Sequence, residues 1–334
     1  MATQPDPTFN HDALAAFWDH LDAQIAAANE ARLKRQNQWT DAGRQAASIS
    51  AGPFTAADRH ALRSYLESPH AQPPQCSVHM AMPLVMQGID ALASAGTLSP
   101  MAAIKMVLFF EPRRDFGAFL PERIRQVIER VHQATGSPTL LELAGMLEDA
   151  GLSARGPLLD YCRHTEIALG RNWPDEHVSP YFEQHKTELM QLLLDRKGII
   201  VSHSDSGASD IRAIGLNREA VYRAAAMVAR TSPAFVDALF GIAFGTTASE
   251  RELAQSALRS VEGHEARIAG FIDDRKAKTR AIAAQWLAQL GNPAARPLLE
   301  RALQSEKNEA ARIAMSEALH SLSAGADGSP VSSR

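Results

Sequence analysis

The sequence predicts an all-α chain of stacked helix pairs, and three observations support this prediction. Ala and Leu, which favour helices, account for 58 and 33 of the 334 residues, whereas Val and Ile together account for 28. Apolar residues recur at helical spacing in successive segments of the chain. One helical pattern also recurs about every 30 residues toward the C-terminal end. This composition argues against a parallel α/β enzyme core.

The overall charge and cysteine content point to a cytoplasmic protein. A net charge of −4 gives no bulk attraction to nucleic acid or to anionic membranes. The two cysteines, Cys76 and Cys162, cannot build a disulfide framework. We expect them to stay unpaired, because the cytosol is reducing. The sequence has neither an N-terminal signal pattern nor an apolar run near the 18 residues that a membrane span needs. We therefore expect a cytoplasmic chain without a membrane segment.

The first predicted segment, residues 1–52, consists of one long helix and a connection. Asn10 stands at the N-cap position, and the following apolar residues share one face of a helix. This stripe consists of Leu14, Phe17, Trp18, Leu21, Ile25 and Ala28. The small residues 42–52 are typical of a connection to the next helix.

Residues 53–208 are predicted to form irregular helical repeats. Thr55 and Asp58 have the spacing of a capping box. Ser-Pro pairs precede several apolar segments, and Ser and Pro favour the N-cap and first position of a helix. These pairs are Ser99-Pro100, Ser137-Pro138, Ser179-Pro180 and, in the next segment, Ser232-Pro233. The short run Gly198–Ser202 is too small for an independent sheet, so we expect a loop with at most one extended piece.

Residues 209–322 carry the repeat that determines the architecture. Three helical segments begin with Arg251, Arg280 and Arg312, and each has Leu at its eighth position. A weaker copy begins at Arg218. Shorter apolar helices lie between these segments, and such helix pairs must stack on their neighbours to bury their apolar faces. The prediction is a HEAT/armadillo-like α-solenoid, followed by a disordered tail over residues 323–334.

Residues 280–295, followed by Leu298-Leu299 and Ser305-Glu306-Lys307, resemble the HEAT-repeat region of the large bacterial molybdate-metabolism-regulator-like proteins. The resemblance covers about residues 232–322. In those proteins the repeats precede a C-terminal domain of unknown function, and we expect that domain to be missing here because the sequence ends just after the repeats. The resemblance implies an α-solenoid with a bacterial, cytoplasmic interaction role and no known activity. It also implies that the repeated Arg side chains brace neighbouring repeats.

Six basic residues are the candidate interaction or repeat-bracing residues. Arg251, Arg280 and Arg312 open the three repeats, whereas Arg275, Lys276 and Lys278 form the densest basic cluster. A solvated helix start explains that cluster most simply, because Asp273 and Asp274 precede it. The alternative is an edge that contacts phosphates, as in HEAT-like DNA glycosylases.

Metal chemistry is a third hypothesis. The pairs Cys76/His79 and Cys162/His164 contain residue types that bind zinc, although their spacing does not match a zinc motif. The pair His11-Asp12 is also found in helical metal-dependent hydrolases, but no His precedes it and an Asp at a helix start explains it better. No phosphate-binding or nucleophile motif occurs, so we expect no cofactor, metal or catalytic residue.

The sequence therefore favours a non-catalytic protein-binding scaffold that uses the concave face of an α-solenoid. A few aromatic or Arg anchors would supply the affinity for a protein partner whose identity the sequence does not give. A nucleic-acid-binding or DNA-repair module is the first alternative, and the metal-dependent hydrolase is the second.

Overall fold

A computed structural model describes residues 11–36, 54–68, 82–110, 120–163, 168–195, 199–201, 212–245 and 247–326. The chain divides into two compact units, which we describe separately. The first unit comprises Met1–His185 and Lys197–Ala220, and the second comprises Lys186–Arg196 and Val221–Arg334. The chain thus enters the second unit at Lys186, returns to the first, and crosses again at Val221. The boundary expected between residues 208 and 209 stays a prediction.

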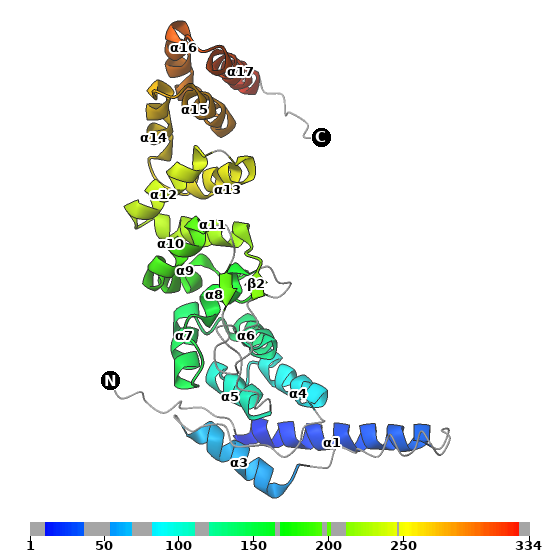
Figure 1. The fold of residues 1–334 in the computed structure, drawn as a ribbon. Coiled ribbons are helices and arrows are strands. Elements are labelled where there is room, and N and C mark those ends of the chain that lie inside the picture. The colour runs from blue at the N-terminus through cyan, green and yellow to red at the C-terminus, as the bar shows by residue number, and fades with distance from the viewer. Residues whose placement is uncertain are drawn as a thin grey trace. The chain divides into compact units, whose positions relative to one another are not determined.

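The described part of the first unit consists of helices and one small sheet (Figure 1). The helices are α1 (His11–Gln36), α3 (Ala56–Glu67), α4 (Met82–Ser94), α5 (Pro100–Phe110), α6 (Glu122–Thr135), α7 (Leu140–Asp149), α8 (Gly156–Cys162) and α9 (Asp175–Gln184). The strands are β1 (Ile199–Val201) and β2 (Arg212–Ile214), which pair in antiparallel register. The extended piece expected in the run Gly198–Ser202 is present at Ile199–Val201, but the expectation that this run forms no sheet was wrong, because it pairs with Arg212–Ile214. Residues 198 and 202–207 lie outside the described residues.

The second unit contains helices that pair in succession (Figure 1). They are α10 (Lys186–Leu194), α11 (Arg218–Ala229, which begins in the first unit), α12 (Pro233–Ala243), α13 (Ala248–Leu258), α14 (His264–Gly270), α15 (Ala277–Leu290), α16 (Arg296–Ser305) and α17 (Glu309–Ala326). Helix α12 packs on α13, α14 on α15, and α16 on α17. Helices α15 and α17 also pack on each other, so successive pairs stack. The all-α, solenoid-like fold is confirmed.

Local signals fixed several helix ends. Thr55 and Asp58 form the capping box, with the Asp58 amide donating to Thr55 Oγ1 over 3.1 Å. Helices α5 and α12 begin at the Pro of their Ser-Pro pairs. The pair Ser179-Pro180 was misleading, because Pro180 lies inside α9. Asp175 and Glu176 occupy the first turn of α9, where carboxylates favour the helix start.

The predicted stripe of the first helix is buried except for Ala28, which is exposed, and its aromatic residues pack into a cluster. Phe17 and Trp18 are buried, and their rings approach Phe110 at centroid distances of 6.2 Å each. Gly88 of α4 lies against Phe17, and a Cβ atom at position 88 would be 2.8 Å from that ring. The absence of a side chain at Gly88 therefore allows α1 and α4 to approach closely. At the other end of the chain, α17 extends to Ala326, so the tail expected from residue 323 was placed too early.

A second buried cluster in the first unit contains polar side chains. Glu129 accepts hydrogen bonds from the Gly170 amide (2.6 Å) and from the indole N–H of Trp173 (3.0 Å). The ring of His132 stacks on Trp173 at 3.8 Å between centroids. Burial raises the pKa of Glu129, because an ionised carboxylate loses hydration there. Burial also lowers the pKa of His132, and neighbouring His177 acts in the same direction.

Acidification is therefore expected to destabilise the first unit through His132. In the unfolded chain His132 takes up a proton near pH 6.5, whereas in the folded chain it does so only at lower pH. The free energy of unfolding should thus fall as the pH drops below about 6.5. The raised pKa of Glu129 has the opposite effect on the free energy of unfolding. Wild type is therefore compared with His132→Phe at each pH, so that the contribution of Glu129 cancels. The substitution should remove this loss, and an NMR titration of His132 at or above pH 6.5 would contradict the prediction.

Candidate interaction surface

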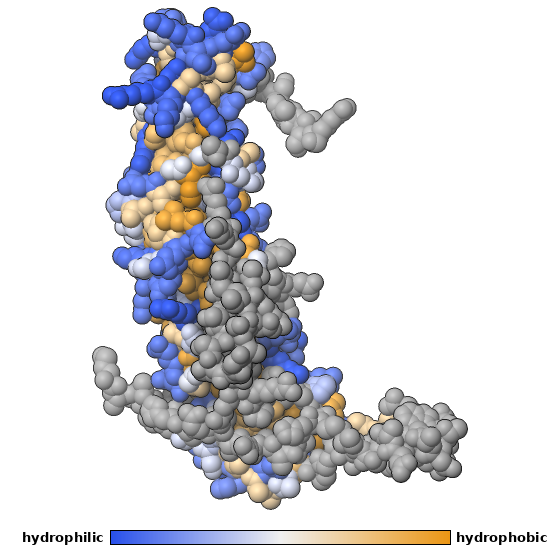
Figure 2. All heavy atoms as spheres, viewed as in Figure 1, coloured by the Kyte–Doolittle hydropathy of each residue, from blue (hydrophilic) through white to orange (hydrophobic). Residues whose placement is uncertain are grey.

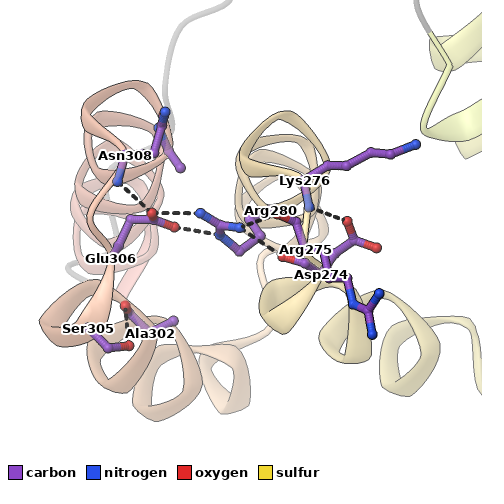
Figure 3. A network of polar contacts seen from close by, with 9 residues as sticks. Asp274, Arg275, Lys276, Arg280, Ala302, Ser305, Glu306 and Asn308 are labelled. Atoms are coloured by element: carbon purple, nitrogen blue, oxygen red, sulfur yellow. Dashed lines mark hydrogen bonds and ion pairs between the residues drawn. The ribbon is translucent and has the colours of Figure 1, made fainter.

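Arg280 lies at the start of α15 and holds the turn between α16 and α17. Its Nε and Nη2 atoms donate to the two carboxylate oxygens of Glu306 at 2.6 and 2.7 Å (Figure 3). Its Nη1 atom donates to the backbone carbonyls of Asp274 (2.8 Å) and Arg275 (3.2 Å). The planar guanidinium is suited to this arrangement, because it presents several donors in fixed directions. One side chain therefore joins two adjacent helix pairs.

The electrostatics of this ion pair favour its charged form. The Glu306 side chain is 3% exposed and that of Arg280 is 19% exposed. The hydrogen bonds from Arg280 are the main reason that the pKa of Glu306 is lowered to about 2, and the Asn308 amide also contributes. The same bonds raise the pKa of Arg280. A shallow cleft of about 260 Å³ lies beside the pair and is lined by Ile272, Asp273, Asp274, Arg280, Ala302, Ser305, Glu306, Lys307 and Met315.

The two other repeat arginines have different surroundings. Arg251 is half-buried, and its Nη1 atom donates to the carbonyl of Gly245 at 3.2 Å. Gly245 lies six residues before Arg251, the same separation that joins Asp274 to Arg280. Arg312 is exposed at the start of α17, and within the described part of the chain its side chain has no hydrogen-bond or ion-pair partner.

The three cations of the basic cluster surround the N-terminus of α15. Arg275, Lys276 and Lys278 are exposed, and the Lys276 amide donates to Asp274 Oδ1 at 2.7 Å. Asp273, which is also exposed, adds negative charge beside them. The structure therefore brings the cluster next to Arg280 in space, but the charge of Arg280 is already balanced by Glu306.

A groove on the second unit was not singled out in the sequence. It has a volume of about 290 Å³ and is lined by Ala229, Arg230, Thr231, Ser232, Pro233, Val236, Phe240, Val261, Glu262, Gly263, His264 and Arg267. The guanidinium of Arg267 lies 4.2 Å from the centre of the Phe240 ring and pairs with Asp237 at 2.7 Å. Figure 2 shows hydrophobic residues gathered over α12 and α14 on the face that it draws. Periodicity alone could not find this groove, because α12 and α14 bring its residues together only in the folded chain.

Of the residues considered for metal chemistry, Cys162, His11 and Asp12 belong to the described part of the chain. Cys162 is buried and burial raises the pKa of its thiol to about 12, while Cys76, His79 and His164 lie outside the described residues. His11 and Asp12 stand in the first turn of α1. Among the described residues, no three His, Cys, Asp or Glu side chains gather as metal ligands would. A search of the same residues finds no helix with the length and apolar character of a membrane span.

One comparison with known proteins gives a match. The PBS lyase HEAT-like repeat matches residues 279–305, which include Arg280, nearly all of the rest of α15, and α16. No curated protein and no solved structure matches the chain. Residues 279–305 are therefore similar to a HEAT-like repeat, in agreement with the stacked helix pairs around them.

Proposed function

We propose that the chain is a non-catalytic scaffold that binds a protein partner through its helix stack. The groove between α12 and α14 is the observation that carries this proposal. Protein interfaces draw most of their affinity from aromatic and Arg anchors that lie in well-packed pockets. The groove offers the apolar Val236 and Val261 beside an Arg267 guanidinium held over Phe240.

The rest of the second unit is consistent with a scaffold role. The most strongly perturbed carboxylate there, Glu306, is held by Arg280 and has a lowered pKa, so it favours an ion pair over proton transfer. In our proposal Arg280 braces the stack, while the groove binds the partner. The resemblance of residues 232–322 to molybdate-metabolism-regulator-like proteins stays a prediction, as does a cytoplasmic location.

A charge placed in the groove is expected to remove partner binding. Val236→Glu introduces a carboxylate beside Phe240 and Val261, where burial on binding would cost several-fold to hundred-fold in affinity, or about 1–3 kcal/mol. The measurement compares proteins that co-purify with wild type and with this variant. Ala234→Glu is the matched control, because Ala234 is exposed on the same helix and does not line the groove. Equal recovery of every co-purifying protein by both variants would rule out this groove as the binding site.

The nucleic-acid alternative depends on the exposed cations Arg275, Lys276 and Lys278, and it can be tested directly. Duplex binding would need these cations to contact phosphates, and such contacts weaken steeply with salt. We expect no saturable binding of a labelled 20-base-pair duplex at about 150 mM salt, because Asp273 and Asp274 adjoin the cluster. Fluorescence anisotropy measures this. Saturable binding that Lys276→Gln and Lys278→Gln together abolish would instead support the nucleic-acid function.

A further inference from the structure

Two turns of the second unit carry a carboxylate at the same spacing before a repeat Arg. Asp274 stands six residues before Arg280, and Glu306 stands six residues before Arg312. Each carboxylate accepts the backbone N–H two residues ahead at 2.7 Å, from Lys276 and from Asn308 respectively (Figure 3). A carboxylate thus lies in the turn before each of α15 and α17. Glu306, in the turn before α17, accepts a hydrogen bond from Arg280 of α15.

The face of α15 that carries Arg280 is covered by the next helix pair. Ala284 and Leu287 follow Arg280 at spacings of four and seven, so all three residues share one helix face. Ala284 is 0% exposed and Leu287 is 3% exposed. Helix α17 packs on α15, and the turn before α17 supplies Glu306 to Arg280. An acidic turn followed by a helix is therefore what covers this face.

The equivalent face of α17 is open among the described residues. Arg312, Ser316 and Leu319 occupy the places of Arg280, Ala284 and Leu287 in the repeat. Arg312 and Ser316 are exposed and Leu319 is half-buried. Ile313 beside them is 51% exposed, an unusual value for a large apolar side chain in this unit. We call Arg312, Ile313, Ser316 and Leu319 the α17 face.

We propose that the α17 face binds a helical segment of a partner protein, and that the turn before this segment presents a carboxylate to Arg312. The proposal rests on the scaffold function and adds a second contact point to the groove. Charge complementarity supports it, because Arg312 lacks the carboxylate that Arg280 has. A second copy of the chain is a poorer occupant, because its Glu306 is 3% exposed and already bound to Arg280.

A peptide that spans residues 291–326 is the probe, because this segment contains α16, the turn with Glu306, and α17. The labelled peptide is titrated onto the full chain and followed by fluorescence anisotropy. We expect binding that Arg312→Gln in the chain, or Glu306→Gln in the peptide, weakens about tenfold, the usual effect of losing a charge-assisted hydrogen bond. Combining both changes should add little further loss, because each removes the same contact. Arg301→Gln in the chain is the control and should leave peptide binding unchanged, because Arg301 is exposed on α16 and lies outside the α17 face.

Three results would overturn the proposal. The first is no binding at about 1 mM peptide, an affinity of only about 4 kcal/mol. The second is binding that Arg312→Gln leaves unchanged, since the peptide would then occupy another face. The third is concentration-dependent dimerisation of the full chain that Arg312→Gln abolishes, which would assign the face to a second copy. The Val236→Glu chain should bind the peptide like wild type, so a failure at the groove is distinguishable from a failure here.

Discussion

Asp160→Asn is expected to destabilise the first unit by about 3–5 kcal/mol, because it leaves a buried guanidinium without its counter-charge. Asp160 is 0% exposed, and its Oδ1 atom accepts a hydrogen bond from Arg125 at 2.9 Å. The Arg125 side chain is 4% exposed, and its Nε atom has no hydrogen-bond partner among the described residues. Asn keeps one acceptor oxygen, which can take the Leu120 amide that now bonds Asp160 Oδ2 at 3.1 Å. Its NH2 group then faces the Arg125 donor that Asp160 Oδ1 accepts. The loss therefore combines the missing charge with the missing acceptor, and chemical denaturation measures it.

Two further variants separate the buried charge from a general loss of packing. Arg125→Met added to Asp160→Asn should recover part of the stability, because it removes the deeply buried guanidinium. The recovery is only partial because Arg163, which is 23% exposed and lies 3.6 Å from Asp160 Oδ1, still loses its partner. Glu67→Gln removes one partner of the exposed pair between Arg63 and Glu67 and should cost less than about 1 kcal/mol. An Asp160→Asn cost no larger than that of Glu67→Gln would show that Arg125 does not depend on this carboxylate.

The fold class could be predicted because it depends on features that repeat or act locally. Arg280 and Arg312 mark equivalent helices, and the spacing of their neighbours indicates which face each helix buries. The capping box at Thr55 is also local, because its partners are three residues apart. Local signals failed at Pro180, where a helix that had already started at Asp175 continued through the Pro. Pro180 is the sixth residue of α9, beyond the first four unpaired N–H groups, so it removes the hydrogen bond that an amide there would donate to the Glu176 carbonyl.

The features that could not be predicted depend on contacts between distant residues. Lys105 is 4% exposed, yet its Nζ atom donates to the carbonyls of Tyr65 (3.2 Å) and Leu66 (3.3 Å) near the end of α3. No sequence signal near position 105 predicts these hydrogen bonds, because the partners lie about 40 positions away. The groove beside Phe240 has the same origin, because Arg267 reaches it from another helix. The basic residues were found from the sequence, but the carboxylate that balances Arg280 lies 26 positions away.

Glu306→Gln should weaken the second unit and change how its stability responds to acid. The loss of a charge-assisted, two-point contact is expected to cost about 1–3 kcal/mol at pH 7. Folded Glu306 has a pKa of about 2, below its ordinary value of 4.5, so its ionised form stabilises the fold above about pH 5. This contribution should disappear as the pH falls from 5 to 2. Wild type should thus lose more stability on acidification than Glu306→Gln.

The control for this prediction is Glu300→Gln in the same unit. Glu300 pairs with Arg296 at 3.1 Å, but both side chains are about half exposed, so water screens their attraction. Its substitution should cost less than about 1 kcal/mol at pH 7. Arg280→Gln should reproduce the effect of Glu306→Gln, and the two together should cost less than their sum because they break one shared contact. Simple additivity of the two losses would mean that Arg280 and Glu306 stabilise the stack independently and that the ion pair does not join the helix pairs.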